Sequence, residues 1–138
     1  MELDITNGFI DKHYDLIICF DVLEHIEDDL AALRNMHKMT GKHIVISTLE
    51  GKMRDFEKEI GHIRNYQRGE LEEKLNICEF KILKKIKWGF PLYSPVYRNL
   101  LNFKLANEQT YGYYSRYKII VCRILYYLFY LSIPSKGD

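Results

Sequence analysis

The sequence lacks an excess of charge of either sign, because 20 lysines and arginines are balanced by 19 aspartates and glutamates. The formal net charge is +1, so no strong basic field is available to neutralise the phosphates of a nucleic acid. We therefore expect no nucleic-acid partner. Hydrophobic residues make up 47% of the chain and charged residues 28%, a balance typical of a folded protein and not of a disordered one.

Cysteine is also scarce. The three cysteines, Cys19, Cys78 and Cys122, are odd in number, widely spaced and set among apolar residues. This pattern favours neither a disulfide framework nor a zinc site. The opening residues "MELDITNGFIDK" lack the basic start and apolar core of a secretory signal. Together these features indicate a reducing, cytoplasmic setting.

Glycine-rich loops of the phosphate-binding kind do not occur in the 138 residues, which argues against a dinucleotide-dependent oxidoreductase. All three prolines follow residue 90, and nine of the eleven tyrosines lie between Tyr93 and Tyr130. A chain of this length is expected to form one globular unit. Within it, the shift in composition predicts an α/β core over residues 1–92 and a helical, tyrosine-rich tail over residues 93–138.

Two short, continuously apolar and β-favouring runs, "YDLIICF" at residues 14–20 and "KHIVIST" at residues 42–48, predict strands. The first predicts a strand buried on both faces, as in the middle of a parallel sheet. Between the two runs, Asp28 or Asp29 can begin a helix that continues to about Met39. Strand, helix and strand with short links predict a right-handed crossover in an open, mostly parallel sheet.

Further signals follow this unit. Gly41 is placed to end the helix, and apolar residues at helical spacing follow over residues 53–60. The segment "GELEEKLN", residues 69–76, predicts another short helix. Alternation of apolar residues with lysines in "FKILKKIKW", residues 80–88, predicts a strand near the edge of the sheet. A further helix is expected to begin near Ser94.

The segment "RYKIIVCRILYYLFYLSI", residues 116–133, predicts a helix that is apolar on nearly all sides. Its longest apolar run, residues 119–133, is shorter than the roughly 20 residues needed to span a bilayer, and Arg123 interrupts it. Two partners stay open for this helix. It can pack against the domain or a partner subunit, or it can lie on a membrane surface as a peripheral contact.

A cluster of polar residues follows the first predicted strand. In open parallel sheets, ligands bind beyond the carboxyl ends of the strands, and residues 21–29 occupy that place. A metal site built from Glu24, His25, Glu27 and Asp28 is not favoured, because consecutive residues on a turn diverge and no ligand pair at helical spacing accompanies them.

The stretch "DLIICFDVLEHIEDDLAALRNMHKMTGKHIVIST", residues 15–48, resembles the class I S-adenosylmethionine-dependent methyltransferases. In that family a strand ending in aspartate leads into a "VLEH" turn, a helix and the next strand. The segments "GHIRNYQRGELEEKL" and "WGFPLYSPVYRNLL" are similar to the downstream part of a subgroup associated with sugar, lipid or cell-surface biosynthesis. The resemblance implies a Rossmann-like sheet, S-adenosylmethionine as cofactor, and methyl transfer to a small-molecule acceptor such as a saccharide or lipid precursor.

Two parts of the family pattern are not found in the sequence. The glycine-rich loop after the first strand is missing, as is the second strand, and "MELDIT" resembles the end of the third strand. The resemblance therefore implies a truncated enzyme, represented by its carboxy-terminal portion, and leaves open whether the chain is active alone. A second hypothesis is a non-catalytic Rossmann-like remnant that acts as a protein- or membrane-interaction module.

The resemblance also implies residues that contact the cofactor. Asp4 and Ile5 match the end of the third strand beside the adenine, with the aspartate accepting a hydrogen bond from the exocyclic amine. Phe20 and Asp21 match residues that line the other side of the cofactor.

Glu24 and His25 match residues that face the methyl group or the substrate, while His62 and Tyr66 resemble a flap over the pocket. A sulfonium is already an activated leaving group, so positioning supplies much of the acceleration of methyl transfer. A base is needed only where an acceptor hydroxyl or amine must lose a proton, and a histidine suits that task near neutral pH. We therefore expect His25 to be the base.

Simpler roles stay open for the same residues. Asp4 and Asp21 can cap turns that follow strands, and His25 can pack against the following helix. His62 and Tyr66 can be ordinary loop residues.

Overall fold

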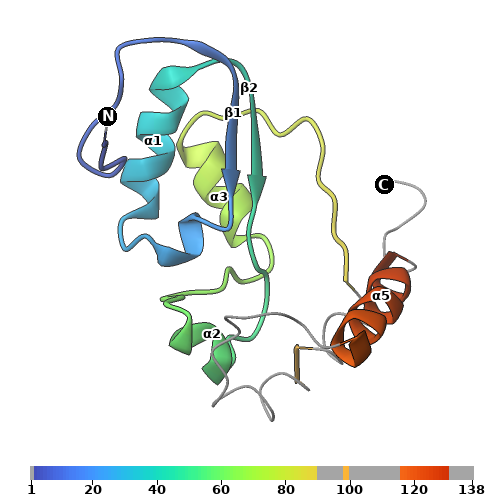
Figure 1. The fold of residues 1–138 in the computed structure, drawn as a ribbon. Coiled ribbons are helices and arrows are strands. Elements are labelled where there is room, and N and C mark those ends of the chain that lie inside the picture. Colours follow the sequence, from blue (N-terminus) through green and yellow to red (C-terminus); the bar gives the residue numbers. More distant parts are fainter. Residues whose placement is uncertain (1, 90–97, 100–115, 131–138) are drawn as a thin grey trace. The chain divides into compact units, whose positions relative to one another are not determined.

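A computed structural model of the chain describes residues 2–89, 98–99 and 116–130 (Figure 1). Its contacts divide the chain into two units, which we treat separately. The first comprises Met1–Met53 with Ile60–Leu83, and the second comprises Arg54–Glu59 with Lys84–Asp138. The predicted boundary between residues 92 and 93 lies outside the described residues.

The first unit contains strands β1 and β2 and three helical segments. These are β1 (Tyr14–Phe20), the 3₁₀ turn η1 (Leu23–His25), α1 (Asp29–Met39), β2 (Thr40–Ser47) and α3 (Glu70–Ile77). The second unit contains α2 (Asp55–Glu59) and α5 (Arg116–Tyr130). The predicted first strand, the α1 helix, the 69–76 helix and the described part of the last helix are therefore confirmed.

β1 and β2 form a parallel pair joined by α1, which confirms an α/β arrangement of strand, helix and parallel strand. Ile17 lies opposite Ile44, and Cys19 lies opposite Ile46. These four side chains belong to or pack against one apolar cluster, which also takes side chains from both α1 and α3. The buried members of the cluster are Cys19, Leu23, Ala32, Leu33, Met36, Met39, Tyr66 and Cys78.

The opposite face of the two-stranded sheet is uncovered in the part of the chain that the structure describes. Leu16, Phe20 and Val45 are each about half exposed, and Ile18 is 60% exposed. The prediction that β1 is buried on both faces is therefore wrong. The reason is that an apolar run sets which residues can be buried, whereas burial itself needs a second layer of chain to cover that face.

The start and end of α1 have separate causes. Asp28 caps the helix, because its Oδ1 accepts a hydrogen bond from the Ala31 backbone N–H at 2.9 Å. The chain then leaves α1 directly into β2 at Thr40, whose hydroxyl donates to the Met36 carbonyl at 2.7 Å. That bond satisfies one of the carbonyl groups left open at the end of a helix.

The sequence predicts that Gly41 ends α1, but this residue lies inside β2. A Cβ at this position would come within 3.1 Å of the Tyr14 carbonyl oxygen on the neighbouring strand. Glycine is therefore favoured here by the close approach of β1 and β2 at their first residues.

Two further expectations from the sequence are wrong. Residues 80–88 form no strand, because alternation defines a face but does not supply a pairing strand. Residues 4–7 form a turn and not the end of a strand, with the Asn7 N–H donating to the Asp4 carbonyl at 3.1 Å. The helix expected over residues 53–60 is present in shorter form, as α2. The helix expected from Ser94 lies outside the described residues except at residues 98–99, which are helical.

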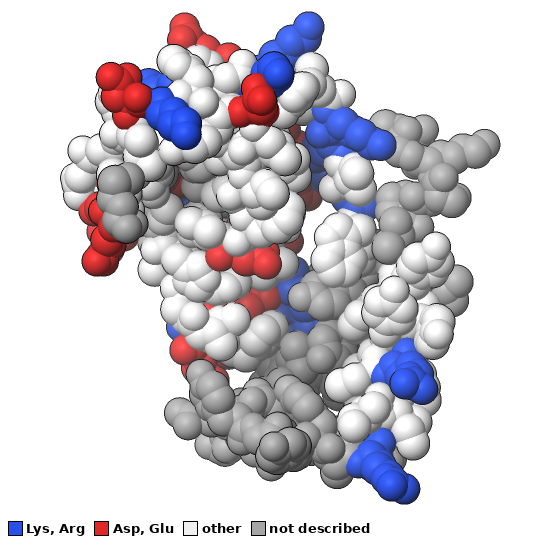
Figure 2. Space-filling view, turned by 45° about the horizontal axis from the view of Figure 1, so that its top comes forward, with Lys and Arg blue, Asp and Glu red and all other residues white. Residues whose placement is uncertain are grey.

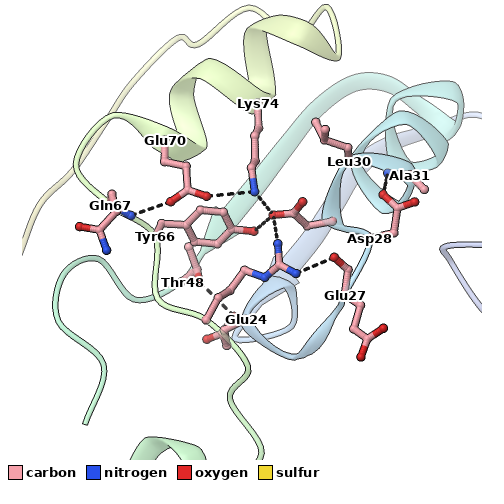
Figure 3. A network of polar contacts seen from close by, with 12 residues as sticks. Glu24, Glu27, Asp28, Leu30, Ala31, Thr48, Tyr66, Gln67, Glu70 and Lys74 are labelled. Atoms are coloured by element: carbon pink, nitrogen blue, oxygen red, sulfur yellow. Dashed lines mark hydrogen bonds and ion pairs between the residues drawn. The ribbon is translucent and has the colours of Figure 1, made fainter.

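A buried carboxylate fixes α3 and the segment before it to the start of α1. The Asp29 side chain is 5% exposed, and its Oδ2 accepts from the Tyr66 hydroxyl at 2.7 Å and from Lys74 Nζ at 2.7 Å. Arg64 Nη1 lies 3.0 Å from the same oxygen. Figure 3 shows Tyr66 and Lys74 pointing toward this one carboxylate, with Glu70 on the other side of Lys74.

These contacts change the pKa of Asp29. Burial alone would raise it, but the hydrogen bonds from Lys74 and Tyr66, with the positive charge of Arg64, hold it below its ordinary value. The ionised form is therefore the one that the fold stabilises.

The second unit has a buried ion pair of its own. Arg98 donates from Nε to Glu57 Oε1 at 2.7 Å, and both side chains are almost fully buried. Glu57 Oε2 accepts from the Arg54 backbone N–H at 2.8 Å, and Arg54 Nε donates to Asn99 Oδ1 at 2.8 Å. These bonds join α2 to residues 98–99.

We predict that Asp29→Asn lowers the free energy of unfolding by roughly 3 kcal/mol, because it removes the buried anion that Arg64 and Lys74 share and leaves Lys74 with Glu70 alone. Because the pKa of Asp29 is lowered in the fold, its stabilisation is present above the unfolded-state value of about 4 and is lost as pH falls below it. The difference between wild type and variant should therefore shrink on acidification. Urea denaturation at several pH values measures both quantities.

Asp28→Asn is the matched control, since an asparagine oxygen can keep the cap on α1 and Asp28 is exposed. It should change stability by only a few tenths of a kcal/mol. Equal losses for the two variants would show that the ion cluster does not stabilise the fold.

Candidate functional site

The carboxyl ends of the two parallel strands lie side by side, at Phe20 and Ser47. The next residue after β1, Asp21, donates its backbone N–H to the Ser47 carbonyl at 2.9 Å and has a φ of 51°. Residues other than glycine seldom adopt this left-handed backbone conformation, although aspartate tolerates it better than most. The chain therefore turns sharply where the strand ends, and leads at once into η1.

Glu24, in the η1 turn, is fully buried. Its Oε2 accepts from the Thr48 hydroxyl at 3.0 Å, which joins η1 to the residue after β2 (Figure 3). Its Oε1 has no hydrogen-bond partner among the described residues. Burial of a carboxylate is costly unless its oxygens are bonded, so Oε1 is a strong acceptor held ready for a donor group.

His25 is exposed and is held through one ring nitrogen. Nδ1 lies 2.9 Å from the Gly61 carbonyl oxygen, and because a carbonyl can only accept, this contact places the proton on Nδ1. Nε2 is then the nitrogen able to accept a proton. Gly61 has a φ of 93°, a left-handed backbone conformation that favours glycine and that orients its carbonyl in this turn.

His62 lies beside these residues, although it is far from them in the sequence. The His25 and His62 rings are 4.6 Å apart, centroid to centroid, in an edge-to-face arrangement. The Ile63 N–H donates to the Glu24 carbonyl at 2.9 Å, which ties the segment to η1. His62 is buried, and its Nδ1 has no hydrogen-bond partner among the described residues. The structure thus brings together Glu24, His25 and His62.

Tyr66 has a different environment. It is 1% exposed, its hydroxyl donates to Asp29, and burial followed by this hydrogen bond raises its pKa. Its backbone pairs with the segment after β2, donating to Leu49 and accepting from Gly51. These contacts give Tyr66 a structural role, and a role facing the substrate stays a prediction.

The residues expected to contact a cofactor fall into two places. Phe20 and Asp21 are exposed at the end of β1. Asp4 is exposed in a turn, where the Thr6 hydroxyl and N–H bond to one carboxylate oxygen and lower its pKa, and Asn7 bonds to the other. The carbonyl of Ile5 accepts from Asn35 of α1 at 2.8 Å, which fixes this turn against the helix.

Thr48 was not identified from the sequence as a site residue. A signal for it exists, because the rule that places Asp21 at the carboxyl edge of the sheet applies equally to the residue after the second strand. Among the described residues, no group of three or more histidine, cysteine or acidic side chains is arranged to hold a metal ion.

Comparisons with known proteins found no relative of the chain. No family model matches the chain, and no curated protein and no solved structure matches it either. The arrangement of Glu24, His25, Thr48 and His62 is therefore interpreted from its own chemistry and from the sequence motif that contains it.

We predict that Glu24→Gln raises the free energy of unfolding by about 1 kcal/mol, because glutamine can still accept from Thr48 but removes a buried charge that has a single hydrogen bond in the described structure. Thr48→Val is the matched comparison and should lower it by roughly 1–2 kcal/mol, since it leaves the carboxylate without that donor. Chemical denaturation measures both. A clear loss of stability in Glu24→Gln would mean that the fold needs the charge.

The cysteines provide a second prediction. Burial, with the nearby charges of Glu24 and Asp21, raises the pKa of Cys19 to about 11, and Cys19 is buried, whereas Cys122 on α5 is exposed. Alkylation of the native protein at mildly alkaline pH, followed by mass spectrometry, should therefore modify Cys122 first and Cys19 only after denaturation. Rapid modification of native Cys19 would contradict this placement of β1.

Proposed function

We propose that the chain is the carboxy-terminal part of a class I S-adenosylmethionine-dependent methyltransferase, with a Rossmann-like core, that acts on a small-molecule acceptor. One observation carries the proposal. Glu24, His25 and His62, which the motif assigns to the reaction side of such an enzyme, come together next to the carboxyl ends of two parallel strands. This is the edge at which open α/β sheets bind their ligands.

Residues at this edge, and Asp4 in its separate turn, suit the cofactor. Phe20 offers a half-exposed aromatic surface beside the carboxylate of Asp21, which suits an apolar and cationic ligand. In its own turn, the Asp4 carboxylate keeps acceptor capacity for an amine, because among the described residues its Oδ2 accepts one hydrogen bond, from Asn7. When bound, S-adenosylmethionine would supply an activated methyl group. The protein's task is then to orient the acceptor and to accept its proton.

His25 is suited to accept that proton. The Gly61 carbonyl accepts a hydrogen bond from Nδ1, which leaves Nε2 as the ring nitrogen able to accept a proton. Glu24 Oε1 can accept a hydrogen bond from a second donor on the acceptor molecule. A hydroxyl-rich saccharide, or a lipid precursor with a polar head, carries such donors.

A second candidate is a non-catalytic interaction module, and one observation favours it. The described residues leave large apolar side chains exposed on the sheet face and on α5, such as Ile18, Val45, Ile120 and Ile124. Exposed apolar surface on this scale is typical of protein or membrane contacts.

Ligand binding separates these candidates. We expect S-adenosylmethionine or its demethylated product to raise the melting temperature, with stabilisation of about 2.7 kcal/mol at a ligand concentration one hundred times Kd. Asp21→Ala should abolish the shift. Asp15→Asn, an exposed change near the opposite end of β1, should leave it intact. If ligand at up to about 1 mM caused no shift in melting temperature, any binding free energy would be weaker than roughly 4 kcal/mol, and the proposal would be overturned.

A further inference from the structure

We propose that α5 binds the surface of a membrane that contains anionic phospholipids, with its isoleucines and tyrosines placed among the headgroups and its arginines on the phosphates. This interaction is separate from methyl transfer. It requires neither a cofactor nor an acceptor, and it uses none of the residues of the candidate site.

The first support is the unequal burial around the helix. Val121, Leu125 and Phe129, at spacings of four residues, form one partly buried stripe. The other described side chains of α5 are exposed. They include six large residues that a water-facing helix would not usually expose together: Ile119, Ile120, Ile124, Tyr126, Tyr127 and Tyr130.

The second support is charge. Arg116 and Arg123 are exposed and lie seven residues apart, so they share one side of the helix with Ile119 and Ile120. From residue 109 to residue 137 the sequence has no aspartate or glutamate, although the whole chain is nearly neutral. Figure 2 shows blue and no red atoms on the α5 part of the face that it draws. The helix is therefore complementary to an anionic surface.

Arginine and tyrosine are both suited to the boundary between lipid and water. An arginine can lay its aliphatic stem along apolar groups while its guanidinium reaches a phosphate. Tyrosine combines an apolar ring with a hydroxyl, which favours the headgroup level. A lipid surface can thus satisfy both kinds of side chain on the same face of α5.

Other partners fit less well. Among the described residues, no helix is long and apolar enough to cross a membrane. A symmetric contact between two copies of this face would bring the arginines of both copies together with no acidic residue of the helix to pair them, which is unfavourable. The charge pattern therefore favours anionic lipid over a second copy of the chain.

The test is flotation of the full chain with vesicles of phosphatidylcholine alone and with added phosphatidylglycerol. We expect binding to the anionic vesicles that weakens with salt. Arg116→Gln with Arg123→Gln should reduce it by roughly 30-fold, since each basic residue near a charged membrane surface contributes about fivefold. Lys81→Gln with Lys84→Gln removes the same charge from exposed positions outside α5 and should leave binding unchanged.

A second pair of variants tests the apolar contribution. Ile120→Ser with Ile124→Ser should reduce binding, whereas Leu83→Ser with Ile86→Ser, which changes exposed apolar residues elsewhere, should not. Far-ultraviolet circular dichroism confirms that each variant is folded. Equal losses for the α5 and control variants would overturn the proposal. Absence of binding to anionic vesicles would also overturn it. The same holds if the chain does not bind them and sedimentation instead shows a dimer that the two isoleucine substitutions dissociate.

Discussion

The buried carboxylate of Asp29 is the interaction on which the arrangement of the first unit most depends. It lies at the start of α1 and receives Arg64, Tyr66 and Lys74 from a segment more than thirty residues away. His62 lies within the same segment, just before Arg64. One side of the candidate site is therefore held in place by a charged cluster in addition to the apolar contacts of Tyr66 and α3, so its geometry depends on ionisation as well as on packing.

Local patterns were sufficient to predict several elements. The strand at residues 14–20 and the helix beginning at Asp28 and Asp29 follow from a continuous apolar run, a capping aspartate and helical spacing, which are properties of neighbouring residues. Elements that form only by pairing with a distant segment could not be predicted in the same way. Residues 80–88 have the alternation of a strand, but the described chain gives them no strand to pair with.

The candidate site divides along the same line. Asp21, Glu24 and His25 could be placed from the rule for the ends of parallel strands, since they follow β1 directly. The approach of His62 to His25 came only from the motif, because no local pattern connects residues so far apart. The same rule places Thr48 at this edge, but its contact with Glu24, and the three donors on Asp29, depend on how separate segments meet, which no pattern of neighbouring residues specifies.

The bare side of the two-stranded sheet has a consequence for the chain as it leaves the ribosome. The outer edges of this two-stranded sheet have no third strand beside them in the described structure, so their backbone groups can pair with other extended polypeptides, and Leu16, Ile18 and Phe20 make the open face apolar as well. Chaperones bind exposed surfaces of this kind, and other incompletely folded chains aggregate through them. The yield of native molecules in a cell should thus depend on how soon something shields this sheet.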